Sequence, residues 1–245
     1  LGLVVDIDGG ETPDGWQVAR VPGWGYEMLH SQVGPFYIDV GPGEVIDARS
    51  FGWGIEQGED GGLEWSVPNI VCDAVRRGGG GGGTPWMLVP RSLPAMLYRE
   101  REEAPVVRTG GPTFPITVDD ASPLVLDYCE LLTAFPRFTV TGPEGARVTV
   151  TYAESFFEPG GNKGDRNAIE GKEMWGYQDV LVLDGEECTF EPLWWRTYRY
   201  LRIESVAPVT VVRVGAVETG YPYEVASSFV GEGTSEIWDT AVRTV

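Results

Sequence analysis

Short runs in which apolar and polar residues alternate make up most of the second half of the chain. The run 147–152 places Val148, Val150 and Tyr152 on one face and arginine or threonine on the other. A period of two residues is typical of a β-strand with one buried face. Glycine or proline separates this run from comparable ones at 106–108, 114–118, 124–131, 137–140, 180–183, 195–203 and 209–217. The pattern therefore predicts a sheet of many short strands.

Two turn-rich regions interrupt the pattern. The turn 142–145, Gly-Pro-Glu-Gly, favours a hairpin between 138–141 and 147–152. The first hundred residues carry weaker strand signals, at 1–7, 16–21, 36–40 and 44–47. Consecutive glycines at 78–83 predict a flexible loop or linker, because glycine loses the most conformational freedom on folding.

The stretch 190–204 combines aromatic rings with arginines. A period of two puts Trp195, Leu201 and Ile203 on one side of a strand and Tyr198 and Tyr200 on the other. Both faces then carry bulky side chains, which predicts a central strand that packs on both sides. Large rings usually fill a β core, so packing is the simplest role for these residues.

The last residues change to a helical period. Thr234 or Ser235 can cap a helix whose apolar positions are Ile237, Trp238, Ala241, Val242 and Val245. The predicted fold class is thus all-β, with antiparallel β-sandwich or jelly-roll domains and the start of an α-helix at the C-terminus. We expect three parts: an N-terminal β-sandwich over 1–105, a second sandwich over 106–220, and a linker with a first helix over 221–245.

The charge and the cysteine content of the chain limit which partners and which compartment are expected. The 245 residues carry a formal charge of −19, which repels phosphate backbones and anionic lipid, so neither nucleic acid nor a membrane is an expected partner. The apolar start at 1–7 lacks the basic residues and length of a secretion signal. Three cysteines without a paired spacing favour a cytoplasmic location, and a secreted or periplasmic one stays open because the front of the chain can be missing.

Polar residues concentrate between two strands, at 154–179. Long loops on a β scaffold are where binding residues gather, and we select Asp165, Asn167, Glu170 and Trp175 as candidate carbohydrate-binding residues. Three interpretations remain open: a calcium site built from oxygen ligands, a carboxylate pair for glycosidic acid–base chemistry, and a solvated loop held by ion pairs of Arg166 and Lys172. No cofactor other than calcium is expected.

The sequence gives little support for a metal site at histidine, for a serine hydrolase site or for a nucleotide-binding loop. The single histidine, His30, has no companion at ligand spacing, and the sequence contains neither a Gly-x-Ser-x-Gly elbow nor a phosphate-binding Gly-x-x-x-x-Gly-Lys motif. Trp53, Trp65 and Trp86 lie in or beside glycine-rich segments, where a ring either anchors a loop or stacks on a sugar.

Several motifs, in this order, resemble the region of bacterial α-L-rhamnosidases that precedes the helical catalytic barrel. They are Ile46-Asp-Ala-Arg, Leu88-Val-Pro-Arg-Ser-Leu-Pro-Ala-Met, Tyr152-Ala-Glu, the run 163–172, the stretch 190–200, Tyr221-Pro-Tyr-Glu-Val, Ser228-Phe and Ile237-Trp. The resemblance implies an inverting glycoside hydrolase in which β-sandwich modules lead into an (α/α)6 barrel. That barrel carries the catalytic carboxylates, so no catalytic residue is expected here.

Two functions are expected, the first from the resemblance and the second from Trp53, Trp65, Trp86 and the polar loop around Asp165. In the first, the chain is the non-catalytic β-sandwich portion of an enzyme that removes terminal α-L-rhamnose from glycosides, and it is inactive without a helical catalytic domain. In the second, it is a stand-alone carbohydrate-binding module for rhamnose-containing sugars. Both imply a rhamnose-containing glycoside or oligosaccharide as the ligand.

Overall fold

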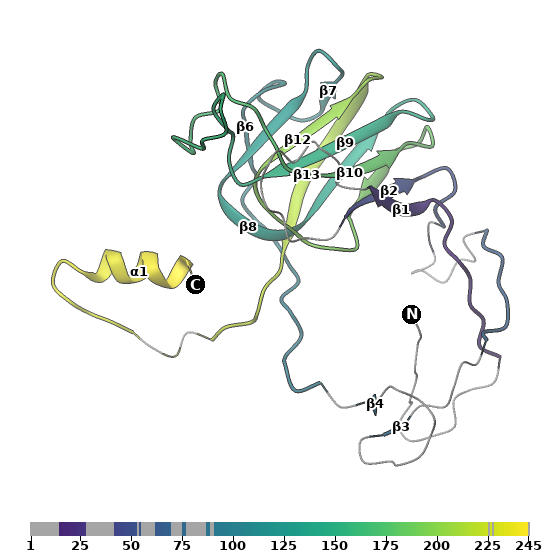
Figure 1. The fold of residues 1–245 in the computed structure, drawn as a ribbon, viewed down its shortest axis with the longest axis horizontal. Helices are drawn as coiled ribbons and strands as arrows, with labels where there is room; N and C mark the ends of the chain where they lie inside the picture. The colour runs from purple at the N-terminus through teal and green to yellow at the C-terminus, as the bar shows by residue number, and fades with distance from the viewer. Residues whose placement is uncertain are drawn as a thin grey trace.

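The computed structural model describes residues 15–27, 42–52, 54, 62–69, 75–76, 87–88, 91–224, 226 and 228–244. Nearly all of their secondary structure is β, which confirms the all-β class (Figure 1). The strands are β1 Trp24–Glu27, β2 Gly43–Asp47, β3 Val75–Arg76, β4 Met87–Leu88, β5 Arg99–Glu100, β6 Val106–Val107, β7 Ile116–Val118, β8 Leu124–Thr141, β9 Arg147–Ala153, β10 Tyr177–Val182, β11 Cys188–Phe190, β12 Arg196–Ser205 and β13 Val209–Glu218. The strands expected at 1–7 and 36–40, and the glycine run 78–83, lie outside the described residues.

Eleven of these strands form one mixed sheet in the order β1-β2-β10-β9-β12-β8-β13-β5, with β11 and β6 beside β8 and β7 beside β13. The sheet curls over itself, so that strands from its two ends enclose one core (Figure 1). Ile46 of β2 and Val118 of β7 belong to the same buried cluster, although their strands lie far apart in the sheet order. This core gives the sandwich that the alternating pattern predicts.

The central strand β8 is longer than expected. The sequence predicts two strands, broken at Phe135-Pro136, but β8 is continuous from Leu124 to Thr141. On one edge β8 pairs with β11 over Phe138–Val140 and with β12 over Leu124–Ala134, so Pro136 lies opposite the gap between them. On the other edge Pro136 lies opposite Ala216 of β13, whose carbonyl accepts the Arg101 N–H, so the ladder does not need the N–H that proline lacks.

The predicted hairpin between 138–141 and 147–152 is wrong. The turn at Gly142–Gly145 joins β8 to β9, but β9 pairs with β10 and β12 instead. A side chain at Gly142 would contact Val209 and Leu183, at 2.7 and 3.0 Å from its Cβ, so the turn crosses close-packed core. The absence of a side chain there lets the chain pass from one layer to the other.

The strand β12 is central, as predicted, but its two faces change phase. Tyr198, Leu201 and Ile203 all lie in the main core, whereas the period-2 pattern puts Tyr198 opposite the other two. The register slips between Tyr198 and Tyr200, where the four β8 residues 128–131 oppose the single β12 residue Arg199. Within that bulge Cys129 has a φ of 66°, a conformation that relieves the extra length.

The outer face of β12 is covered by the segment 154–176. Tyr200 packs there with Val125, Ala153, Phe156 and Met174 in a second buried cluster. The second packed surface that the aromatic pattern predicts is therefore formed by the chain's own loop.

The two first strands join this same sheet. β2 pairs in parallel with β10, and β1 pairs antiparallel with β2. A separate sandwich over 1–105 stays a prediction, because many of these residues lie outside the part of the chain that the structure describes. Strands 24–27 and 43–47 are part of the sheet formed by 106–220.

The C-terminal helix α1, Ser235–Thr244, confirms the helical prediction. The Trp238 N–H donates to the Thr234 carbonyl, and the Trp238 ring contacts the Phe229 ring at 5.7 Å. Ile237 is 70% exposed and α1 is drawn apart from the sheet (Figure 1), so its apolar side is not covered by β strands. Within the described residues, no helix has the length and apolar character to cross a membrane.

Candidate functional site

The four candidate residues of the polar loop are engaged mainly within the loop or with the sheet beneath it. The Asp165 carboxylate accepts the Asn167 N–H at 2.9 Å, and the Asp165 carbonyl accepts a bond from Lys172 at 2.6 Å. The Asn167 side-chain oxygen accepts a bond from Arg199 at 2.9 Å. These contacts fix the loop's shape and favour the interpretation of a solvated loop held by cations.

The other two candidates have similar local roles. Glu170 accepts the Ile169 N–H and lies 3.8 Å from Arg108, and backbone hydrogen bonds lower the pKa of Glu170. Trp175 stacks on Phe157 with the ring centroids 4.9 Å apart. The loop is thus tethered by Arg108 and Arg199, whereas Arg166, the predicted anchor, contributes its carbonyl to the Tyr200 hydroxyl.

A buried aspartate organises this tether. Asp127 on β8 is 2% exposed and receives two hydrogen bonds from Arg199, at 2.8 and 3.1 Å, and one from Arg108 at 3.0 Å. Burial by itself would raise the pKa of Asp127, but these guanidinium groups and the Cys129 N–H hold that pKa below its usual range. We call Asp127, Arg108 and Arg199 the loop anchor.

Within the described residues, no three His, Cys, Asp or Glu side chains converge in a way that could hold a metal ion. The carboxylates of Asp165 and Glu170 each accept a backbone N–H. Calcium binding at this loop stays a prediction.

A second buried carboxylate cluster lies at the start of β12. Asp179 on β10 is fully buried and receives two hydrogen bonds from Arg196, at 2.6 and 3.1 Å. Burial alone would lower the pKa of Arg196, but the hydrogen bonds and charge of Asp179 raise it, so the guanidinium stays charged. Asp179 also accepts the backbone N–H of Glu44 at 2.7 Å, which connects the cluster to β2.

The Glu44 carboxylate holds three separate groups. It accepts the indole N–H of Trp24 at 3.1 Å and the backbone N–H groups of Leu193 and Trp194 at 3.0 and 2.9 Å. Arg196 lies 3.7 Å from it. We call Glu44, Asp179 and Arg196 the pocket anchor, because the groups that Glu44 holds line or border an open pocket.

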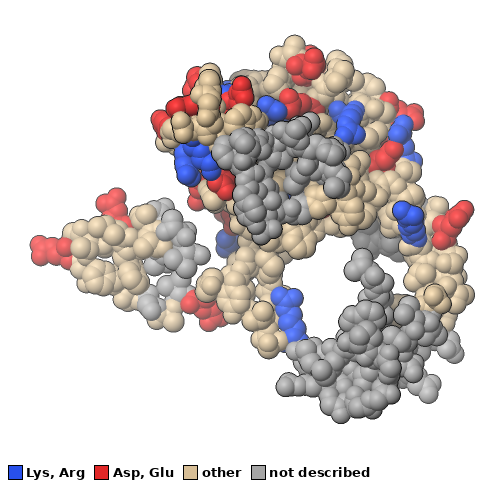
Figure 2. All heavy atoms as spheres, in the orientation of Figure 1, with Lys and Arg blue, Asp and Glu red and all other residues tan. Residues whose placement is uncertain are grey.

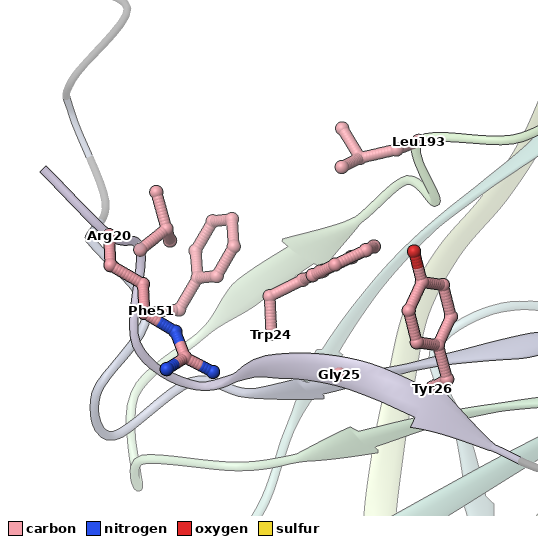
Figure 3. A pocket seen from close by; sticks show the side chains of 7 residues that line it. Arg20, Trp24, Gly25, Tyr26, Phe51 and Leu193 are labelled. Carbon is pink, nitrogen blue, oxygen red and sulfur yellow. The ribbon is translucent and has the colours of Figure 1, made fainter. Parts of the chain in front are cut away.

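This pocket has a volume of about 510 Å³. Figure 3 shows Trp24 and Tyr26 rising from β1 toward Leu193, with Phe51 beside Trp24. The Trp24 and Tyr26 rings meet edge to face, 4.7 Å between centroids. The lining is mostly apolar and is completed by Arg20, Val21 and Gly25.

The sequence analysis did not select any residue of this pocket. One signal was available, since Trp24 and Tyr26 are two positions apart and therefore lie on one face of a strand. The contribution of Leu193 has no local signal, because it depends on the break between β11 and β12. Of the three tryptophans considered for sugar stacking, Trp65 is 41% exposed, and Trp53 and Trp86 lie outside the described residues.

The charged surface is mixed. Figure 2 shows acidic and basic side chains interspersed over the sheet, with no continuous basic area on the face in view. That face therefore lacks the electrostatic footprint of a polyanion-binding surface.

Comparison with known proteins places part of this fold in a family. Residues 118–218 match the model of the bacterial α-L-rhamnosidase concanavalin-like domain. This segment runs from the end of β7 to the end of β13 and includes the loop anchor's Asp127 and Arg199. A comparison with curated protein sequences finds no match.

Two solved structures are similar. One is a GH78 family rhamnosidase from Bacillus sp. GL1, at 17% identity and a TM-score of 0.40, over 58% of this chain and 14% of that one. The other is a rhamnosidase from Klebsiella oxytoca with rhamnose bound, at 14% identity and a TM-score of 0.46, over 62% of this chain and 35% of that one. The chain thus spans about a third or less of either structure's length. Residues 118–218 are thus similar to the concanavalin-like domain of bacterial α-L-rhamnosidases.

Proposed function

We propose that this chain is the non-catalytic β-sandwich portion of an α-L-rhamnosidase-like glycoside hydrolase. The parent enzyme removes terminal α-L-rhamnose from glycosides with inversion, and its catalytic carboxylates lie downstream, in a helical domain. The observation that carries the proposal is the family match over 118–218.

The carboxylates of the described chain support a non-catalytic role. An inverting glycosidase needs one carboxylic acid that can give up a proton and one carboxylate that can activate water, on opposite sides of the sugar. The buried carboxylates in the described part are Glu44, Asp127 and Asp179, and each lies within 4.0 Å of an arginine. For Asp127 the arginine partners hold the pKa below its usual range, so this carboxyl is a poor proton donor at neutral pH. The pocket lining contains no carboxylate.

The proposal is tested by hydrolysis of an aryl α-L-rhamnoside. We expect no release of the aryl group by the 245-residue chain, and release by a longer gene product that continues past Val245. Proton NMR at early times should then show the β anomer of rhamnose, as inversion requires. Turnover by the 245-residue chain would refute the non-catalytic role, and an α anomer as first product would refute inversion.

Binding of a rhamnose-containing sugar without cleavage is the second candidate function. The observation that favours it is the open aromatic pocket at Trp24 and Tyr26, because aromatic rings suit the C–H faces of a pyranose. The two functions are compatible, since a supporting domain can also hold part of the substrate.

A further inference from the structure

The pocket is assembled from three distant segments of the chain. Trp24 and Tyr26 come from β1, Phe51 follows β2, and Leu193 belongs to the turn between β11 and β12. That turn lies where the β8 edge passes from β11 to β12, opposite Pro136. The pocket is therefore a product of the fold.

One buried group holds both walls of the pocket in place. The Glu44 side chain is 4% exposed, and it binds the Trp24 indole on one wall and the Leu193 N–H on the other. Glu44 is held in turn, because its backbone N–H donates to Asp179 and its carboxylate lies 3.7 Å from Arg196. A pocket wall that buried, charged hydrogen bonds hold in place is preorganised, so ligand binding does not include the entropic cost of ordering that wall.

The rings of the pocket are accessible to a ligand. Tyr26 is 60% exposed and Leu193 is 70% exposed, whereas a ring that serves only as a packing anchor is covered. The Tyr26 ring and the Leu193 side chain are thus open to solvent within the described structure.

The lining defines the chemistry of the ligand. Aromatic and aliphatic walls require an apolar face, and the Arg20 guanidinium and Tyr26 hydroxyl can hydrogen-bond polar groups at its edge. The formal charge of −19 disfavours an anion. A volume of about 510 Å³ falls in the range of small-molecule sites and holds one or two sugar rings.

We propose that the pocket formed by Trp24, Tyr26, Phe51 and Leu193 binds a neutral pyranose, stacked on the aromatic pair, without a metal ion. The aliphatic walls at Val21 and Leu193 favour a sugar that carries a methyl group in place of a hydroxymethyl group. The choice of L-rhamnose as the probe rests on the proposed rhamnosidase function; the site itself rests on the geometry.

The test is isothermal titration of the 245-residue chain with L-rhamnose and methyl α-L-rhamnoside, in the presence of EDTA. We expect saturable binding, weakened about tenfold by Tyr26→Ala, since a lost aromatic contact corresponds to roughly that factor. Leu193→Ala removes the opposite aliphatic wall and should weaken binding as well, and the fold should be kept because this side chain is 70% exposed. Circular dichroism and the thermal midpoint should be unchanged for Tyr26→Ala, because that ring is mostly exposed.

Matched controls separate the site from general effects. Tyr223→Ala removes an exposed ring that does not line the pocket, and Leu131→Ala removes an exposed leucine that does not line it either. Both should bind like the wild type. The proposal is overturned when neither sugar binds in EDTA, or when Tyr26→Ala and Leu193→Ala bind as well as their controls. Rhamnoside hydrolysis is measured separately, so failure of the pocket and failure of the enzyme assignment give different results.

Discussion

Two arginines of β12 each bind a buried carboxylate of another strand, and the two clusters serve different surfaces. The pocket anchor joins Arg196, at the start of β12, to Asp179, whose side chain is 0% exposed. The loop anchor joins Arg199, three residues later, to Asp127, and its arginines are 15% and 25% exposed. The chemistry of the ion pairs is the same, but one cluster connects strands with strands and the other connects the sheet to a loop.

The difference shows where an open binding surface is to be sought. The loop is rich in polar residues, yet its Asp165 and Asn167 side chains are already bonded to groups of the protein. The pocket is poor in polar residues, and its anchor satisfies the buried charges below the surface while the aromatic rings stay accessible. A polar loop whose side chains already hydrogen-bond within the protein is a weaker binding candidate than an apolar pocket whose rings stay accessible to solvent.

The largest expected effect is at Arg196. Arg196→Met leaves the Asp179 carboxylate buried without its charged partner, and we expect the free energy of unfolding to fall by about 3–5 kcal/mol. Urea denaturation measures the change. The double variant Arg196→Met with Asp179→Leu should recover part of the loss, because it removes the buried charge as well. A single variant as stable as the wild type would contradict a structural role for the pair.

A smaller effect is expected at the loop anchor. Arg199→Met leaves Asp127 with Arg108 and the Cys129 N–H, so we expect a loss of about 1–3 kcal/mol. The loop also loses its bond at Asn167, and limited proteolysis within 154–176 should become faster. Arg49→Ala is the control, since it removes an arginine–aspartate pair on the surface and should change neither measurement. Equal proteolysis of the loop in Arg199→Met and the wild type would show that Arg199 does not tether it.

The smallest effect is a difference in pH dependence. Because the pKa of Asp127 is lower in the folded state, the folded state binds fewer protons at Asp127 than the unfolded state does. Its contribution to stability is present above the ordinary carboxyl pKa of about 4 and is lost as the pH falls toward the lowered value. Urea denaturation from pH 6 to pH 3 should therefore show a shallower decline for Arg199→Met than for the wild type. Parallel declines would mean that Arg199 does not set that pKa.

Local pattern was sufficient for most of the sheet and for α1. Strands such as β9 alternate cleanly, because one face is buried over their whole length. The same rule failed at β12, where Tyr198 and Leu201 face the same core beside the β8 bulge that contains Cys129. It also failed at the turn 142–145, since a glycine–proline turn fits a crossing between layers as well as it fits a hairpin.

The pocket could not be predicted for a different reason. Its walls depend on Glu44, which meets Leu193 across a sequence separation of 149 residues. The buried Asp179 and Glu44 also look like surface acids in a sequence that is rich in them. Long-range partners of this kind leave no periodic trace, whereas the polar loop attracted attention by its composition alone.

The parallel pairing of β2 with β10 has a consequence for synthesis on the ribosome. Glu44 emerges 135 residues ahead of Asp179, the residue that receives its N–H. At a translation rate of about 5–20 residues per second, the β1–β2 hairpin waits on the order of 10 s for its neighbouring strand. Leu193 and Trp194, whose N–H groups the Glu44 carboxylate accepts, are synthesised later still, so the pocket wall opposite Trp24 is completed only after β10 has emerged.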